Sequence, residues 1–360
     1  MTTTINNEHN KLNVPNLRFP EFQGEWITYK IKDVLSIGNG RDYKHLSNGE
    51  IPVFGTGGYM TSVDECLYDG ETTFIGRKGS INKPFYYNGK FWTVDTLFYT
   101  HSFNGITPKF TYCLFQTINW LKYNEASGVP SLSKDTIEKI KIKIPGLEEQ
   151  NKIAKLMFAL DVRITTQNKI IDKLQSLIKG ISSRIFTSIQ GIEYRMGDIV
   201  TITNGNSNVQ DAVTQSKDGL YPFFDRSEDI KYLPTFLFDK EAIIYPGEGT
   251  EFMPRYFKGK FALHQRCYAI FDFNEIINAR FLYFYLKTRN SYFVKNAVGS
   301  TVPSLRLDTF QKLKVIIPSK KIQHSVSLCL SSMEQKCNVE KKILHKLLKQ
   351  KQYLLRQMFI

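Results

Sequence analysis

VPSLSKDTIEKIKIKIPGLEEQNKIAKLMFALDVRITTQNKIIDKLQSLIKGISSRIF, residues 129–186, is the stretch that decides the fold. It returns without a gap as VPSLRLDTFQKLKVIIPSKKIQHSVSLCLSSMEQKCNVEKKILHKLLKQKQYLLRQMF, residues 302–359, with 16 of 58 positions identical. Residues 29–34 and 194–199, which precede the two copies, also resemble each other. The sequence therefore predicts a duplication in which two globular segments are each followed by the same tail.

The tails carry a heptad pattern from Ile153 and from Val326, with apolar residues alternately four and three positions apart. Such spacing predicts long helices of about 58 Å that pair as a coiled coil. Since the duplicate in the same chain is the nearest partner, we expect an intramolecular antiparallel pair rather than a homodimer. Gln167 and Glu340 interrupt both patterns at one equivalent place, where a polar group either fixes the register or marks an exposed end of the seam. The predicted seam residues are Ile153, Met157, Leu160, Ile164, Ile171, Leu174, Ile178, Val326, Leu330, Met333, Leu344, Leu347 and Leu354.

The globular segments are rich in aromatic and β-branched residues with frequent glycines, notably over residues 51–100 and 221–273. This composition predicts short strands joined by tight turns. Helical stretches are expected at 109–123 and 279–294, and the alternation over 136–144 predicts a short strand before the first long helix. The expected fold class is therefore α+β, with two similar domains that have mainly antiparallel sheets.

Composition narrows the class of protein. Of 360 residues, 42% are apolar and 13% aromatic, which excludes global disorder. No apolar run is long enough for a membrane span, and the first residues lack the apolar core of a secretory signal. The five cysteines are scattered without a C-x-x-C pair, so we expect a reducing, cytoplasmic location rather than disulfides or a zinc ribbon.

The sequence contains none of the common catalytic patterns. A Walker nucleotide loop, a G-x-G-x-x-G dinucleotide loop, H-E-x-x-H, G-x-S-x-G, a P-D…E-x-K nuclease pattern and N/D-P-P-Y/F/W are all missing. The six histidines are dispersed, without the spacing of metal ligands. We therefore predict a binding or organising protein, with no catalytic residue, cofactor or metal of its own.

The net charge of +14 favours a polyanionic partner, but most of the excess lies on the tails. Residues 320–360 carry +7 and residues 147–186 carry +3, whereas residues 29–128 and 194–300 carry only +1 each. Local clusters of basic and amide side chains, the types that read base edges, are nevertheless present in both globular segments. The candidate DNA-binding residues are Arg41, Tyr43, Lys44, His45, Arg77, Lys78, Ser80, Asn82, Lys83, Asn206, Ser207, Asn208, Gln210, Arg226, Thr250, Arg255, His264, Gln265 and Arg266.

The alignment predicts that the two segments share a scaffold but differ in their polar loops. In the alignment of the two copies, Glu248-Gly249-Thr250 occupies the place of Arg77-Lys78-Gly79. Two readers of different base sequences need such a difference. For any single candidate residue, the competing interpretation is that it lies in a solvent-exposed turn and does not bind DNA.

The whole layout resembles the specificity subunit of type I restriction–modification enzymes. The resemblance rests on LRFPEFQGEW (17–26), FIGRKGSI (74–81), TVDTLF (93–98), the twice-repeated VPSL with its heptad helix, and LLRQMFI (354–360). It implies four domains. They are a first target-recognition domain with its N-terminal arm (1–146), a first coiled-coil helix (147–190), a second target-recognition domain (191–319) and a second coiled-coil helix (320–360).

The resemblance further implies that each domain reads half of a split site in double-stranded DNA. The helices would set the spacer and dock two methyltransferase subunits, which restriction and translocation subunits join. S-adenosylmethionine, ATP and Mg²⁺ would belong to those partners, and this subunit would be non-catalytic. Two alternatives remain open at this stage: a coiled-coil scaffold or adaptor without DNA specificity, and a DNA-modifying enzyme with an unrecognised motif.

Overall fold

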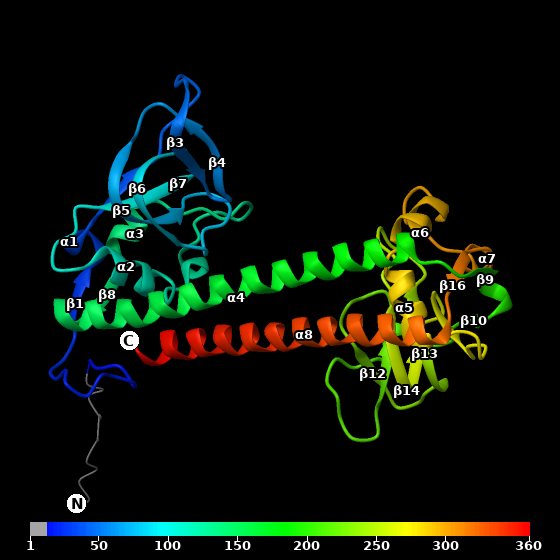
Figure 1. The fold of residues 1–360 in the computed structure, drawn as a ribbon. Helices are drawn as coiled ribbons and strands as arrows, with labels where there is room; N and C mark the ends of the chain where they lie inside the picture. Colours follow the sequence, from blue (N-terminus) through cyan, green and yellow to red (C-terminus); the bar gives the residue numbers. More distant parts are fainter. Residues whose placement is uncertain (1–12) are drawn as a thin grey trace, which may run out of the picture. The chain divides into compact units, whose positions relative to one another are not determined.

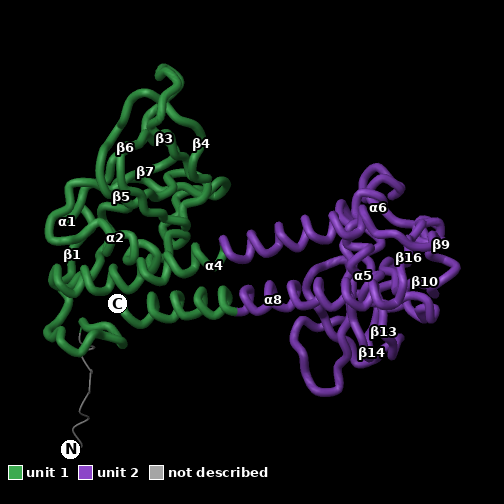
Figure 2. The backbone as a smooth tube through the Cα atoms, in the orientation of Figure 1, with its two compact units in different colours: residues 1–168, 343–360 green, residues 169–342 purple. Residues whose placement is uncertain are grey.

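The computed structural model describes residues 13–360. The chain forms two compact units, shown in different colours in Figure 2. Unit 1 comprises the residues up to 168 together with 343–360, and unit 2 comprises residues 169–342.

Unit 1 is built on a six-stranded sheet with the order β2-β7-β5-β6-β3-β4 (Figure 1). All neighbouring pairs are antiparallel except β3 and β6, which run parallel. Phe74 and Phe91 are fully buried within this sheet. The strands are β2 (Ser36–Asn39), β3 (Asn48–Gly55), β4 (Gly58–Val63), β5 (Tyr68–Gly76), β6 (Phe85–Thr93) and β7 (Leu97–His101).

Unit 2 repeats this sheet strand for strand, in the order β10-β15-β13-β14-β11-β12. Its one parallel pair, β11 with β14, stands at the position of β3 with β6. The strands are β10 (Thr201–Asn204), β11 (Tyr221–Phe224), β12 (Lys231–Leu233), β13 (Phe238–Pro246), β14 (Arg255–Leu263) and β15 (Cys267–Phe271). The predicted duplication into two similar α+β domains with mainly antiparallel sheets is therefore confirmed.

A two-stranded antiparallel sheet leads into each long helix. It pairs β1 (Ile27–Lys30) with β8 (Lys141–Ile144) in unit 1, and β9 (Ile192–Arg195) with β16 (Lys314–Ile317) in unit 2. The prediction of one strand over 136–144 is wrong in its first half. There Ser133 caps a short helix, α3 (Lys134–Lys139), by accepting a hydrogen bond from the backbone of Thr136. A side-chain cap thus overrides the alternating pattern.

The shorter helices also differ from the prediction. The expected helix over 109–123 is divided into α2 (Pro108–Phe115) and a 3₁₀ turn, η1 (Trp120–Tyr123), and that over 279–294 into α5 (Ala279–Lys287) and α6 (Asn290–Asn296). Thr117 and Asn119 lie between the first two pieces and Thr288 lies between the second two, and these residue types are poor helix formers. The remaining short elements are α1 (Ile31–Val34), η2 (Met196–Asp198), η3 (Val209–Asp211) and α7 (Leu307–Gln311).

The two long helices are α4 (Leu147–Ser188) and α8 (Lys320–Gln357). In unit 1 the start of α4, at Ile153 and Met157, shares a core with Met358 at the end of the α8 segment. In unit 2 the end of α4, at Phe186, shares a core with Leu330 near the start of α8. In both units the helices therefore run antiparallel, as predicted.

All predicted seam positions are buried or half-buried, including the polar Gln167 and Glu340. Neither polar residue is thus at an exposed end of the seam. Lys351, which continues the four-and-three spacing of the second tail after Leu347, forms an ion pair with Asp161 within unit 1. The charge of this half-buried lysine is thus balanced by a carboxylate.

A buried glutamine fixes the start of each long helix to its own unit. Gln150 accepts a hydrogen bond from the Thr107 backbone (2.9 Å) and donates to the carbonyls of Gly105 and Pro145 (both 2.9 Å). Gln323 repeats the pattern in unit 2 with Asn278, Ile276 and Pro318, at 2.7, 2.9 and 2.9 Å. Both glutamines are fully buried.

The segment that precedes β1 packs against both long helices in unit 1. Arg18 forms a two-pronged ion pair with the buried Glu149 of α4, at 2.8 and 2.7 Å. The Leu17 backbone donates to the carbonyl of Gln357 at 2.8 Å. The buried Trp26 ring meets Phe359 edge-on, with ring centroids 6.2 Å apart. This segment therefore closes the core at which the two helices meet.

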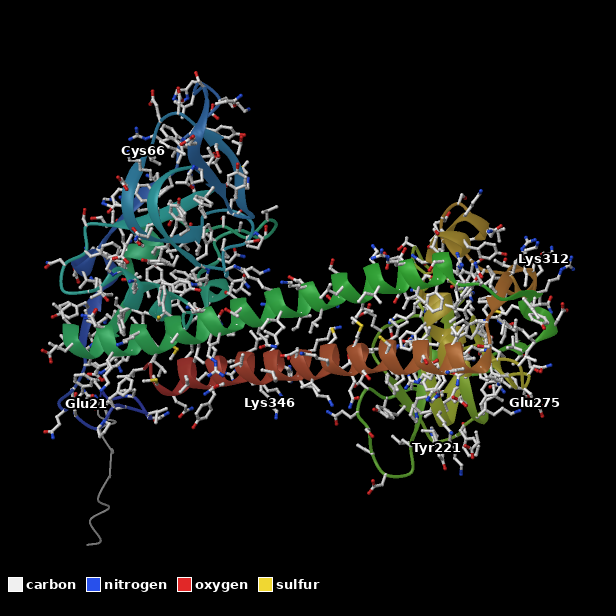
Figure 3. All side chains as sticks on the ribbon, in the orientation of Figure 1. Glu21, Cys66, Tyr221, Glu275, Lys312 and Lys346 are labelled. Carbon is white, nitrogen blue, oxygen red and sulfur yellow. The ribbon has the colours of Figure 1, made fainter. Side chains whose placement is uncertain are left out.

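No helix in residues 13–360 is long and apolar enough to cross a membrane. Figure 3 shows the side chains, among them Cys66 between β4 and β5 of unit 1, which is exposed. Within the described part of the chain, no three His, Cys, Asp or Glu side chains are grouped so as to hold a metal ion.

Candidate nucleic-acid interface

In unit 1 the turn between β6 and β7 gathers the loops that carry the candidate residues. The Gly40 backbone donates to the carbonyl of Leu97 at 3.3 Å. The backbones of Arg77 and Lys78 donate to the carbonyl of Thr96, at 2.8 and 3.2 Å. Segments far apart in the sequence, around residues 40 and 77, therefore meet at one turn, which belongs to the TVDTLF stretch.

The repeated VPSL motif holds the loop that follows β5. The Gly79 backbone donates to the carbonyl of Pro130 at 2.8 Å, and the Leu132 backbone donates to that of Arg77 at 2.9 Å. Lys78 and Ser131 form an isolated β-bridge between these two bonds. The motif thus has a backbone role, which explains why the duplication preserves it while the loop beside it changes.

Unit 2 uses the same bonds, and they correct the alignment of the two loops. The Gly249 backbone donates to the carbonyl of Pro303 at 3.0 Å, and Leu305 donates to that of Gly247 at 2.8 Å. Glu248 forms the bridge with Ser304. The predicted placement of Glu248-Gly249-Thr250 over Arg77-Lys78-Gly79 is therefore wrong by one residue, because the equivalent of Arg77 is Gly247. An acidic Glu248 stands where unit 1 has the basic Lys78.

A cavity of about 720 Å³ lies beside the unit 1 loop, and its lining mixes both signs of charge. Arg77 and Lys78 line it together with Asp95, Glu125 and Lys134. The Arg77 guanidinium donates to the Asp95 carbonyl at 3.2 Å and lies 5.9 Å from the Phe98 ring centroid.

The hydroxyls of Ser133 and Thr136 donate to Glu125 and hold its pKa below the usual range. This carboxylate thus faces the cavity ionised, alongside the basic groups.

The remaining unit 1 candidates lie on the loops next to this cavity. The indole of Trp92 donates to the Arg41 carbonyl at 3.0 Å, and His45 lies edge-on to the same indole. Tyr43 is half-buried against that cluster, whereas Arg41, Lys44 and His45 are exposed. Tyr43 therefore packs as a support, and its neighbours project. The other exposed candidates in this unit are Ser80, Asn82 and Lys83.

In unit 2 the structure brings four of the predicted residues around one cavity of about 540 Å³. Arg226, His264, Gln265 and Arg266 line it, together with Glu248. The amide-rich loop after β10 lies alongside, because the Gln265 backbone donates to the Ser207 carbonyl at 3.2 Å. The neighbouring candidates Asn206, Asn208, Gln210 and Thr250 are exposed.

A buried carboxylate, that of Asp225, lines this cavity. Burial opposes ionisation of Asp225, but hydrogen bonds from Lys231 (2.6 Å) and from the Ser227 hydroxyl (2.5 Å) outweigh it and lower the pKa of Asp225. Arg255 donates to the Asp225 carbonyl and lies 5.4 Å from the Phe224 ring centroid. Arg255 is therefore half-buried against its neighbours and is not among the residues that line the cavity.

His264 presents a neutral ring at this cavity. Desolvation by burial is the main cause that lowers its pKa, and nearby Arg266 adds to the effect. Its Nδ1 accepts a hydrogen bond from the Arg266 backbone at 3.2 Å, which leaves the proton on Nε2. A fixed tautomer makes Nε2 a donor of known direction.

Several residues at these tips were missed from sequence. Asp95 and Thr96 lie in the turn that organises the unit 1 tip, and Glu248, Asp225 and Lys231 line the unit 2 cavity. The TVDTLF stretch carried a signal for the first two. The others are acidic or ion-paired, and selection by basic and amide side chains passes over such residues.

Comparison with known proteins completes the description. The family model described as "Type I restriction modification DNA specificity domain" matches residues 23–176 and again residues 192–349. The chain belongs to this family. The two matches coincide with the duplicated scaffold, so each copy of the family domain contains one six-stranded sheet and much of one long helix.

Curated members of this family are similar over part of their length. The EcoDI specificity subunit of Escherichia coli is 29% identical over 138 residues, which are 38% of this chain and 30% of that protein. The MjaVIII specificity subunit of Methanocaldococcus jannaschii is 32% identical over 125 residues, 34% of this chain and 27% of that protein. The matches therefore span only about a third of these relatives.

The fold as a whole is similar to a solved structure. The type I restriction–modification S subunit from M. genitalium aligns over 96% of this chain and 99% of its own, with a TM-score of 0.73 and 17% identity. A second structure, from a study of complex assembly and conformational transition of the type I R-M system, aligns over 93% of this chain and 97% of its own, with a TM-score of 0.53 and 13% identity. At these identities the likeness concerns the fold.

Proposed function

We propose that this chain is the DNA-recognition subunit of a type I restriction–modification complex, in which unit 1 and unit 2 each read one half of a bipartite target. The observation that carries this proposal is one backbone scaffold used twice with different polar side chains at its tip. The chain supplies recognition and no catalysis. The candidate residues at the two tips, including Arg77 and Lys78 in unit 1 and His264–Arg266 in unit 2, contact the bases.

Equivalent positions at the two tips follow from equivalent backbone bonds. Leu97 donates to the Val94 carbonyl at 3.0 Å, and Cys267 donates to that of His264 at 2.9 Å. Asp95 and Thr96 of unit 1 thus correspond to Gln265 and Arg266 of unit 2. Base readout depends on the pattern of donors and acceptors, so this exchange of side chains gives the units different half-sites. A scaffold protein without DNA specificity has no need of two such tips.

The long helices set the spacing between the half-sites and dock two methyltransferase subunits in this proposal. Exposed apolar side chains on helix faces outside the seam support the docking role, since such groups are typical of protein contacts. They include Val162 on α4 and Leu328 and Tyr353 on α8. Restriction and translocation subunits complete the assembly in the cytoplasm, and S-adenosylmethionine, ATP and Mg²⁺ belong to the partners.

The deciding experiment is a base-resolution methylome of cells that express this chain with its methyltransferase, compared with cells that lack only this gene. We expect a split motif with a fixed spacer that disappears on deletion. An unsplit motif, or methylation that does not depend on this chain, contradicts the proposal. A paired set of variants, Arg77→Ala with Lys78→Ala in unit 1 and Arg266→Ala in unit 2, should each relax a different half of the motif.

A further inference from the structure

We infer that Arg266 reads a guanine in the half-site of unit 2, and that Glu248 is the positioning residue which orients its guanidinium. This inference rests on the proposed function and deepens it, because it assigns a base to one half-site.

The backbone of Arg266 is held on several sides. A backbone hydrogen bond from the Cys267 N–H to the His264 carbonyl (2.9 Å) closes the turn, and the Arg266 N–H donates to Nδ1 of the His264 ring at 3.2 Å. The adjacent Gln265 N–H is bound to Ser207 at 3.2 Å. A Cβ on Gly247 would lie 2.1 Å from the Arg266 carbonyl oxygen, so only glycine allows this approach. The residue thus starts from a fixed platform.

The side chain is anchored at one end and exposed elsewhere. Nη1 of Arg266 donates to Oε1 of Glu248 at 2.7 Å, and the Arg266 side chain is 63% exposed while that of Glu248 is 19% exposed. A guanidinium has five N–H donors in a planar fork, so this contact uses one and leaves the others for a ligand. Holding a long side chain in place before binding reduces the entropy lost on binding.

Two of the neighbouring cations have other tasks. Lys231 is paired with the buried Asp225 at 2.6 Å, and Arg255 is half-buried and donates to the Asp225 carbonyl. Arg266 therefore combines a projecting fork with a carboxylate brace. The bidentate partner that suits such a fork on a base edge is guanine, through its O6 and N7 acceptors in the major groove.

Glu248 makes this feature particular to unit 2. Unit 1 has Lys78 at the position equivalent to Glu248 and Thr96 in place of Arg266, so at these two positions it has neither the guanidinium nor the carboxylate. The inference therefore predicts a guanine contact of this kind for unit 2 alone.

The test uses the assembled complex and duplexes that carry the target defined by the methylome. Each guanine is replaced singly by 7-deazaguanine, which lacks the N7 acceptor, and binding is measured for wild type, Arg266→Ala and Arg266→Lys. At one guanine we expect the replacement to weaken wild-type binding about fivefold or more, and to have no further effect on Arg266→Ala. Arg266→Lys should also lose discrimination, since a lysine keeps the charge but not the fork.

The role of Glu248 is tested on the same duplexes. Glu248→Ala should reduce discrimination at that guanine, and Glu248→Gln should restore much of it, because the amide oxygen still accepts from Nη1. Glu275→Ala, which removes an exposed carboxylate of unit 2 outside this cavity, is the matched control and should leave the effect at this guanine unchanged.

Two outcomes overturn the inference. They are the absence of any guanine coupled to Arg266, and an Arg266→Ala defect equal on target and scrambled DNA, as a phosphate contact would give. A wild-type complex with no preference for its target overturns the proposed function itself.

Discussion

Replacing a buried glutamine that anchors a long helix should destabilise one unit by a predictable amount. Gln150→Met keeps the length of the side chain but leaves the Thr107 N–H and the Gly105 and Pro145 carbonyls without their partner. Each buried group without a hydrogen-bond partner costs about 1–3 kcal/mol. We therefore expect the free energy of unfolding to fall by about 3–5 kcal/mol, because burial of the methionine side chain regains part of the cost.

The tryptophans provide the assay. Trp26, Trp92 and Trp120 are all buried and all belong to unit 1, so tryptophan fluorescence reports the unfolding of that unit. With a urea dependence of about 2–3 kcal/mol per M, Gln150→Met should lower the fluorescence midpoint by about 1–2 M. Gln323→Met, the equivalent change in unit 2, should lower hydrogen-exchange protection around Asn278 and shift the fluorescence midpoint much less.

The matched control is Gln352→Met, an exposed position on α8 in unit 1, which should change the midpoint by less than about 0.3 M. If Gln150→Met behaves like this control, the anchoring role of Gln150 is refuted. Equal fluorescence shifts for Gln150→Met and Gln323→Met would show that the two units do not unfold separately.

Three further predictions concern the helices, the thiols and the cavity carboxylate. Inserting one heptad into both α4 and α8 lengthens each helix by about 10.5 Å, which is the length of about three base pairs of DNA. A methylome should then show a longer spacer between the half-sites, or no methylation. An unchanged spacer contradicts the role of the helices in setting the spacing. At pH 8 an alkylating reagent should label the exposed Cys66 and Cys329 in the native chain, but not the buried Cys113 or Cys267. Burial raises the thiol pKa of Cys113 to about 12 and that of Cys267 to about 11. Mass spectrometry of the labelled peptides measures which cysteines have reacted. Because folding lowers the pKa of Asp225, the stabilisation from its carboxylate is complete above the ordinary pKa of 3.8 and is lost as the pH falls through the lower pKa of the folded state. Asp225→Asn should therefore destabilise unit 2 more at about pH 5 than at about pH 3, as measured by urea titration. An equal effect at both pH values contradicts the ion pair with Lys231.

The long helices and the duplication were predictable because their signals are periodic and repeated. The heptad spacing needs no tertiary information, and Ile153, Met157 and Leu330 are buried as it requires. Local capping was harder to predict. The Ser133 cap that turns residues 134–139 into α3 competes with an alternating pattern, and both signals are present in the same stretch.

The candidate interface was predicted in part. His264, Gln265 and Arg266 lie together around one cavity because they follow one another in a turn. The supporting groups could not be found in this way, since Asp225 and Glu248 are distant in sequence and acidic. Arg255, selected for its charge, turns out to lie half-buried against Phe224, because a guanidinium packs well over an aromatic ring.

The packing of Trp26 against Phe359 has a consequence for the order in which the chain folds during its synthesis. Unit 2 is contiguous, so a ribosome has made all of it once residue 342 is added, whereas unit 1 also needs residues 343–360. Until then the apolar positions around Trp26 and Phe110 lack the Phe359 ring that lies 6.2 Å and 5.4 Å from theirs. Domains usually fold in the order of translation. Here the unit that is translated first is completed last, because its core closes only when residues 343–360 have been added.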